Sequence, residues 1–228
     1  MSNNIADRLK QVREDVASIA EAAGRKAENV KLVAVSKTRP LSAVQEAYDA
    51  GQRLFGENRV QEIVQKAPAM PADCEWHMIG HLQRNKAKSA IEFAGCIHSV
   101  DSMKLSNRIE RLAAERDQSI RILLETNMSG EESKQGVCPE AIRDVLESVL
   151  ECGYLNCQGL MTMAPLGCGE AELRRVFGGL RTLRDQLAKE FGVALPELSM
   201  GMSGDYEAAI REGATLVRIG TAIFGPRK

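Results

Sequence analysis

One lysine occupies a position where this chain could present a reactive amine. Lys37 follows the apolar run Leu32-Val33-Ala34-Val35, which is typical of a strand buried on both faces. Pro40 ends that run, and the residues after it predict a helix. We therefore expect Lys37 at the carboxyl end of a buried strand, where α/β proteins bind ligands. A primary amine beside apolar walls can form a Schiff base with a carbonyl compound, whereas an ordinary lysine there would extend its ammonium into water.

Glycines and hydroxyl residues follow two later segments of the chain. Ser203 and Gly204 precede a predicted helix, and Gly220 and Thr221 follow the last predicted strand. Small residues and free backbone N–H groups at a helix N-terminus can bind an anion, although capped helices show the same residue types without a ligand. In α/β barrels, phosphate sites recur after strands seven and eight, on the face where all strands end. An aldehyde that carries a phosphate could react with Lys37 and bind these turns through its phosphate.

Arg218 is the third residue with chemical potential. It lies in the otherwise apolar segment 216–219, so we expect it to face a ligand or a buried acid. The alternative is an ordinary ion-paired arginine at a strand end. No metal site is expected, because His77 and His81 are four residues apart, a spacing that brings two side chains together on a helix, whereas their segment has the pattern of a strand.

The remaining sequence alternates short apolar segments with helical patterns. The predicted strands are Val30–Lys37, Arg53–Gly56, Trp76–Gly80, Cys96–Val100, Ile120–Thr126, Cys157–Met163, Glu197–Met202 and Leu216–Ile219. The predicted helices between them are Ser42–Ala50, Arg59–Lys66, Lys86–Phe93, Lys104–Arg116, Pro139–Glu151, Glu170–Phe191 and Asp205–Glu212, with Pro139 in a first turn. Eight near-regular units favour a closed (β/α)8 TIM barrel over an open doubly wound sheet. A helical pattern from Ile5 to Ile19, ended by Gly24, adds a helix before the barrel.

Length and composition narrow the possible classes of protein. The chain has 228 residues, and a TIM barrel needs roughly 200–250, so we expect a single domain over residues 1–228. The net charge of −1 argues against nucleic-acid and membrane-surface partners. The sequence shows no signal peptide or membrane span, and its six cysteines form no Cys-x-x-Cys pair, so we expect a cytoplasmic protein with reduced thiols. We also expect a monomer.

Six motifs, in order along nearly the whole chain, resemble the pyridoxal-phosphate homeostasis protein family. That family is similar in fold to the N-terminal barrel of alanine racemase. The motifs are VAVSKTRP (33–40), FGENRVQE (55–62), WHMIG (76–80), GLMTM (159–163), LSMGMSGD (198–205) and VRIGTAIFG (217–225). Leu82-Gln83 and Asn85-Lys86 extend the third motif, whereas His81 departs from the residue expected there.

The resemblance implies a role for each candidate residue. Lys37 would hold pyridoxal 5′-phosphate as a Schiff base. Ser203, Gly204, Gly220 and Thr221 would bind its phosphate, Arg218 would donate to the pyridine nitrogen, and Asn58 would lie beside the ring. The resemblance also implies a protein that acts in cofactor homeostasis without clear enzymatic turnover, with no catalytic residue and with pyridoxal-phosphate-dependent apoenzymes as acceptors.

The chemistry of these residues supports binding better than turnover. A guanidinium does not give up its proton, so Arg218 would leave the pyridine nitrogen unprotonated and the ring a poorer electron sink. Racemisation needs a base on each face of the substrate, and Tyr48, Tyr154 and Tyr206 lie at no clear strand end. Alanine racemase takes its opposing tyrosine from a second domain, which we do not expect here. Weak racemase activity of that type, or a lysine aldolase acting on phosphosugars, are the alternatives.

Overall fold

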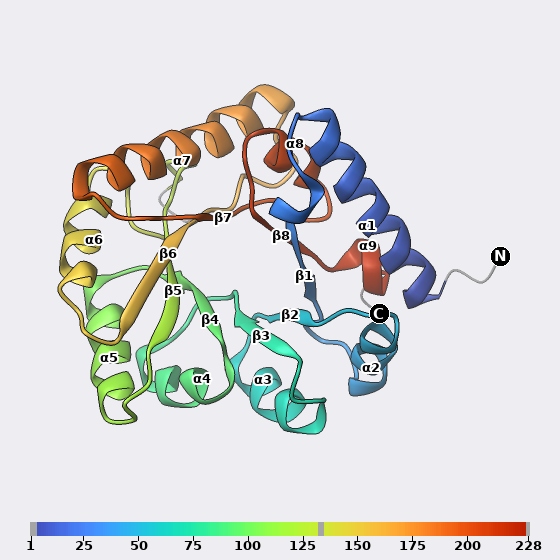
Figure 1. The fold of residues 1–228 in the computed structure, drawn as a ribbon, viewed down its shortest axis with the longest axis horizontal. Coiled ribbons are helices and arrows are strands. Elements are labelled where there is room, and N and C mark those ends of the chain that lie inside the picture. The colour runs from blue at the N-terminus through green and yellow to red at the C-terminus, as the bar shows by residue number, and fades with distance from the viewer. Residues whose placement is uncertain (1–3, 132–134, 227–228) are drawn as a thin grey trace.

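The eight predicted strands pair in chain order and close into a parallel barrel (Figure 1). The computed structural model describes residues 4–131 and 135–226. The strands are β1 Lys31–Val35, β2 Leu54–Glu57, β3 Glu75–Met78, β4 Cys96–Val100, β5 Ile120–Glu125, β6 Leu155–Met161, β7 Glu197–Ser199 and β8 Leu216–Ile219. Because β8 also pairs with β1, the predicted (β/α)8 barrel is confirmed.

Helices surround the barrel on its outside (Figure 1). They are α1 Ile5–Ala22, α2 Leu41–Asp49, α3 Val60–Lys66, α4 Ala87–Phe93, α5 Met103–Ala114, α6 Ile142–Leu150, α7 Glu170–Phe191, α8 Tyr206–Arg211 and α9 Thr221–Phe224. The additional helix predicted before the barrel is α1, which packs against α8, α9 and α2. Among the described helices, none combines the length and the apolar character that crossing a membrane requires.

Several predicted boundaries were wrong at the ends of elements. β1 ends at Val35, because the amide of Arg39 bonds the carbonyl of Ser36 at 3.0 Å and closes a turn instead of extending the strand. β7 ends at Ser199, since Gly201 turns the chain away with a φ of +92°. Pro139 lies in a turn before α6 rather than in its first helical turn. In each case the local backbone conformation ends the regular element earlier, or starts it later, than the residue pattern suggests.

Apolar side chains fill two separate regions. The larger cluster lies between the strands and the surrounding helices, and a smaller one consists of Val33, Cys96, Leu123, Met161 and Leu216 from five different strands. Because successive side chains of a strand point to opposite faces, the smaller cluster fills the barrel interior. The interior is therefore packed, and a ligand can enter only at a mouth of the barrel.

Gly159 allows β6 and β7 to approach each other. It pairs with Glu197 in the sheet, has a φ of +150°, and a Cβ atom there would lie 1.9 Å from the Glu197 carbonyl oxygen. Any side chain at position 159 would therefore push the two strands apart. This pairing matters for the site, since β7 leads directly into the turn that contains Ser203.

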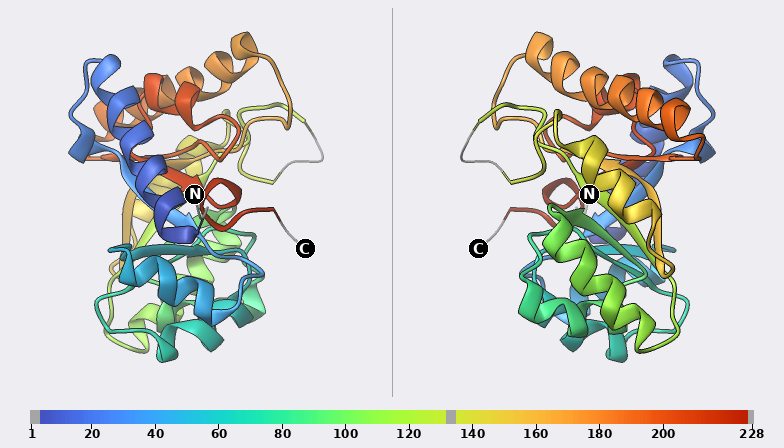
Figure 2. Two further views of the ribbon diagram at one scale, coloured as in Figure 1. Left: turned by 90° about the vertical axis from the view of Figure 1, so that its right-hand side faces the viewer. Right: turned by 90° about the vertical axis from the view of Figure 1, so that its left-hand side faces the viewer.

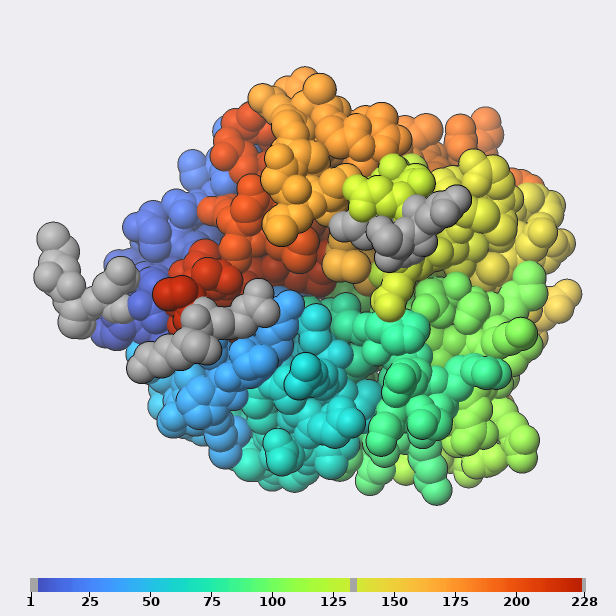
Figure 3. Space-filling view, turned by 180° about the vertical axis from the view of Figure 1, so that it is seen from behind, coloured from blue at the N-terminus to red at the C-terminus, as the bar shows by residue number. Residues whose placement is uncertain are grey.

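The connection after β6 and the described part of the connection after β5 project from the same side of the barrel as the segment after β8 (Figure 2). Strands of a parallel barrel all end at one face, and loops at that face usually carry function. Figure 3 shows this side, with the red C-terminal segments between the orange segment after β6 and the blue-to-cyan part of the chain that follows β1 and β2.

Candidate functional site

A cavity of about 490 Å³ lies at the face where the strands end. All seven residues that the sequence singled out line it: Lys37, Asn58, Ser203, Gly204, Arg218, Gly220 and Thr221. They come from β8 and from the segments after β1, β2, β7 and β8, so no local part of the chain contains the site. The closed barrel brings them together because those strands end at one mouth.

A tight turn, rather than the strand itself, presents Lys37 to the cavity. The turn spans residues 36–39, and Thr38 adopts a φ of +63° within it. A left-handed conformation is strained for a β-branched residue. The backbone amide of Thr38 donates to the Glu62 Oε2 at 2.7 Å, which helps to hold the turn. Lys37 itself is half-buried.

A buried charged cluster supports this turn from behind. The ammonium of Lys66 donates to the Ser36 carbonyl at 2.9 Å, to Glu57 Oε1 at 2.7 Å and to Glu62 Oε2 at 3.0 Å. The Ser36 hydroxyl also donates to Glu57 Oε1, and Glu57 is fully buried. Burial raises the pKa of Glu57 to about 7, while Lys66 and Ser36 act in the opposite direction. The cluster thus ties the reactive turn to α3.

The two turns expected to bind phosphate are joined to each other. The Ser203 hydroxyl accepts a bond of 3.4 Å from the amide of Ala222, in the first turn of α9. Asp205 stands at the N-cap of α8 but does not cap it with its side chain, because its carboxylate accepts from the amide of Met202 instead. Hydroxyls and helix starts from both segments therefore surround one end of the cavity.

Arg218 forms a buried positive charge in the wall of the cavity. Its Nη1 donates to the Ser199 hydroxyl at 2.5 Å, and its Nη2 donates to the Thr162 carbonyl at 2.9 Å. Burial lowers the pKa of Arg218 to about 10, whereas the charges of Asp205 and Glu125 act in the opposite direction. The guanidinium consequently remains protonated at neutral pH and can donate further hydrogen bonds.

Sequence reasoning missed most of the apolar wall of the cavity. Ile79 and the segment 163–168 after β6 line it, and Leu166 on that segment is 97% exposed. The Pro and Gly residues of the segment indicated a loop, but its position over the cavity depends on the fold. Met163 and Met202 also line the cavity, whereas Met161 lies in the barrel interior.

The tyrosines and the two neighbouring histidines lie outside the cavity lining. The hydroxyls of Tyr48, Tyr154 and Tyr206 each donate to an aspartate on the outer layer of the protein. His77 is buried, whereas His81 is exposed and pairs with Asp101 at 3.2 Å. The two imidazoles bond to different partners, because His77 lies on β3 and His81 lies in the segment after it.

Comparison with known proteins defines the class first. The family described as alanine racemase, N-terminal domain, matches residues 8–228. An alanine racemase structure from Clostridium difficile 630 is 13% identical with a TM-score of 0.77, covering 97% of this chain and 57% of that one, so it shares the fold. The protein is thus an alanine-racemase-type barrel.

Closer relatives define the family. The pyridoxal phosphate homeostasis proteins of Aquifex aeolicus and Escherichia coli K12 are 44% and 40% identical, covering 99% of this chain and 99% and 97% of theirs. PipY of Synechococcus elongatus PCC7942 is 40% identical over 97% of this chain and all of PipY; its TM-score is 0.89 without PLP and 0.86 with PLP bound. The chain belongs to the pyridoxal phosphate homeostasis protein family, which confirms the resemblance seen in the sequence.

Proposed function

We propose that this protein binds pyridoxal 5′-phosphate through Lys37 and serves the intracellular supply of that cofactor, without substantial turnover of its own. The observation that carries the proposal is the shared cavity: the lysine turn, the two hydroxyl-bearing turns and the buried guanidinium all line it. The names of the relatives, and the PipY structure with PLP bound, support the same ligand.

The residues of the cavity fit this ligand group by group. The amine of Lys37 would condense with the aldehyde, forming a C=N bond as water leaves. Ser203, Gly204 and Thr221 would surround the phosphate dianion with hydroxyls and helix-start N–H groups. Arg218 would donate to the ring nitrogen, with Asn58 beside the ring. When bound, the cofactor supplies an electrophilic aldehyde and an electron-withdrawing ring.

Two features of the site support storage over catalysis. Arg218 remains charged at neutral pH, so a ring nitrogen facing it would accept a hydrogen bond rather than a proton. The three tyrosines, all within the described residues, have their hydroxyls bonded to aspartates away from the cavity lining. The absence of a second base typically lowers the rate of such a reaction by about 10²–10⁴-fold. Because Lys37 is half-exposed, an incoming amine would be able to take its place on the aldehyde carbon of the cofactor. That exchange would free the Lys37 amine and allow the cofactor to pass to an acceptor apoenzyme.

Borohydride reduction of the cofactor-loaded protein, followed by peptide mass mapping, tests the attachment. We expect the reduced pyridoxyl group on Lys37 and visible absorbance that Lys37→Ala abolishes. Lys31→Ala is the matched control, because Lys31 begins β1, the strand before the Lys37 turn, at the opposite mouth and pairs with Glu197 at 2.6 Å. Labelling of another lysine in place of Lys37 would overturn the proposal. A colourless protein with aldol activity would favour the aldolase.

Two assays test the cellular role and the absence of turnover. The loaded protein should reactivate a pyridoxal-phosphate-dependent apoenzyme, and Lys37→Ala protein treated in the same way should not. Incubation with a panel of L-amino acids should leave their optical purity unchanged on chiral chromatography. Rapid racemisation of any of them would establish the racemase alternative instead.

A further inference from the structure

A continuous column of hydrogen bonds crosses the barrel interior and begins at Arg218. The Arg218 Nη1 bonds the Ser199 Oγ at 2.5 Å, and Ser199 bonds the His98 Nδ1 at 2.9 Å. The His98 Nε2 lies 2.8 Å from the His77 Nδ1, and the His77 Nε2 lies 2.9 Å from the Glu75 Oε1. These residues come from β8, β7, β4 and β3.

The two ends of the column lie at opposite mouths of the barrel. Arg218 lines the cofactor cavity, and it is 4% exposed. The side chain of Glu75 is 41% exposed and accepts a bond of 2.6 Å from Arg121, which is 47% exposed. Because Glu75 starts β3, these two residues lie at the mouth away from the cavity. The three middle residues, Ser199, His98 and His77, are buried.

The chemistry of the ends sets the direction of every bond. A guanidinium can only donate, so the Ser199 hydroxyl accepts from Arg218 and keeps its own proton available for His98. Hydrogen bonds from His77 and Arg121 lower the pKa of Glu75 to about 2, so its carboxylate can only accept. Burial lowers the pKa of both His77 and His98, which favours neutral rings with one N–H each. His77 therefore donates from Nε2 and accepts at Nδ1 from the Nε2–H of His98, whose Nδ1 accepts from Ser199. This order uses all four imidazole nitrogens and leaves both rings neutral.

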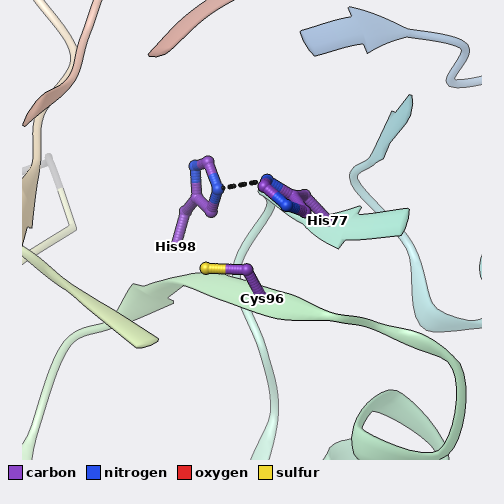
Figure 4. Close-up of side chains that lie close together, drawn as sticks. All are labelled: His77, Cys96 and His98. Atoms are coloured by element: carbon purple, nitrogen blue, oxygen red, sulfur yellow. Dashed lines mark hydrogen bonds between the residues drawn. The ribbon is translucent and has the colours of Figure 1, made fainter. Parts of the chain in front are cut away.

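The same region has a donor set that could suggest a metal instead. Figure 4 shows His77 and His98 joined by their hydrogen bond, with the Cys96 thiol beside them. Donor atoms of these three residues lie within 4.8 Å of one another. A metal would have to displace hydrogen bonds that already engage all four imidazole nitrogens, and it would need a deprotonated thiol. Burial raises the pKa of Cys96 to about 12, so the hydrogen-bonded column accounts for these side chains better.

We propose that Ser199, His98 and His77 are positioning residues, which form a one-directional column that fixes the Arg218 guanidinium and thereby the N–H groups it presents to the cofactor ring. This inference rests on the proposed function. Two N–H groups of Arg218 are committed to Ser199 and to the Thr162 carbonyl, which leaves the others for the cavity. Loss of the Ser199 hydroxyl would free one of them and allow the guanidinium to rotate.

Nitrogen NMR of the histidine side chains tests the column without any cofactor. In the full-length, cofactor-free protein, long-range ¹⁵N–¹H spectra between about pH 6 and 8 should show His77 and His98 as neutral Nε2–H tautomers. The exposed His81 is an internal reference. An Nδ1–H tautomer or an imidazolium at either buried residue would overturn the column, whether or not the protein binds pyridoxal phosphate.

Variants at Ser199 test the effect on the cofactor. Ser199→Ala removes one bond to a charged group, so we expect pyridoxal phosphate to dissociate roughly tenfold faster or more and the absorbance of the bound chromophore to shift. Ser199→Thr keeps the hydroxyl and should restore both properties. Cys96→Ala is the control, because the buried thiol lies beside His77 and His98 without joining the column.

The outcomes separate the possible explanations. If Cys96→Ala changed the dissociation rate and the absorbance as much as Ser199→Ala does, packing rather than the hydrogen-bonded column would hold Arg218 in place. A stoichiometric transition metal in the purified protein, lost on Cys96→Ala, would replace the column by a metal site. Tautomers as expected together with no pyridoxal phosphate binding would refute the proposed function and leave the column standing.

Discussion

The buried ammonium of Lys66 provides a sharp test of how the lysine turn is held. Lys66→Met keeps a side chain of similar length and removes the charge. The change leaves the carboxylate of Glu57 buried without its cation, and the carbonyl of Ser36 without its donor. Breaking a buried ion pair on one side typically costs about 3–5 kcal/mol of the free energy of unfolding.

That cost converts into a measurable thermal shift. In a chain of this length, 1 kcal/mol lowers the melting temperature by roughly 2–4 °C, so Lys66→Met should lower it by about 6–20 °C. The matched control is Lys31→Met. Both ion pairs are short, at 2.7 Å for Lys66–Glu57 and 2.6 Å for Lys31–Glu197, but the lysine side chains are 8% and 56% exposed. An exposed pair contributes only about 0–1 kcal/mol, so the control should melt near the parent.

Chemical denaturation and calorimetry of the parent and the two variants measure these differences. Adding Glu57→Gln to Lys66→Met should recover much of the loss, because the uncompensated charge is then gone. Below its melting temperature, Lys66→Met should also bind pyridoxal phosphate more weakly, since Ser36 and the Thr38 amide lose their support. This account of the turn would be refuted if Lys66→Met were as stable as the parent, or if it were no less stable than Lys31→Met.

Three other substitutions test separate features of the structure. Thr38→Asn should raise the free energy of unfolding by about 1 kcal/mol, measured in urea, because Asn tolerates a positive φ better. Burial raises the pKa of Glu125 from 4.5 to about 7, so the folded protein keeps a proton there that the unfolded chain releases. Stability should therefore fall as pH rises from about 4.5 to 7, by an amount on the order of 1–3 kcal/mol, and urea titrations at several pH values should show that Glu125→Gln removes this component. Gly159→Ala should separate β6 from β7 and reduce the yield of soluble, folded protein. A variant as stable as the parent would contradict the close contact expected between a Cβ at position 159 and the Glu197 carbonyl.

The sequence by itself determined the architecture and the chemistry at the strand ends. Alternating apolar and helical segments were enough to predict the barrel, because eight such units leave few ways to bury their apolar faces. Lys37, Arg218 and the turns at Ser203 and Gly220 were recognisable because each follows or interrupts a buried strand. Strand and helix ends were less predictable, since short turns compete with regular structure there by single hydrogen bonds.

Tertiary structure alone decided which distant side chains became partners. Nothing local in the sequence joins Lys66 to Ser36, or His77 through His98 to Ser199, because residues far apart in the chain become neighbours only when the sheet closes. Closure also places the segment 163–168 over the cavity and excludes water from Arg218. Composition and spacing can identify groups capable of chemistry; the strand register and the burial that follow from closure determine their charge, direction and support.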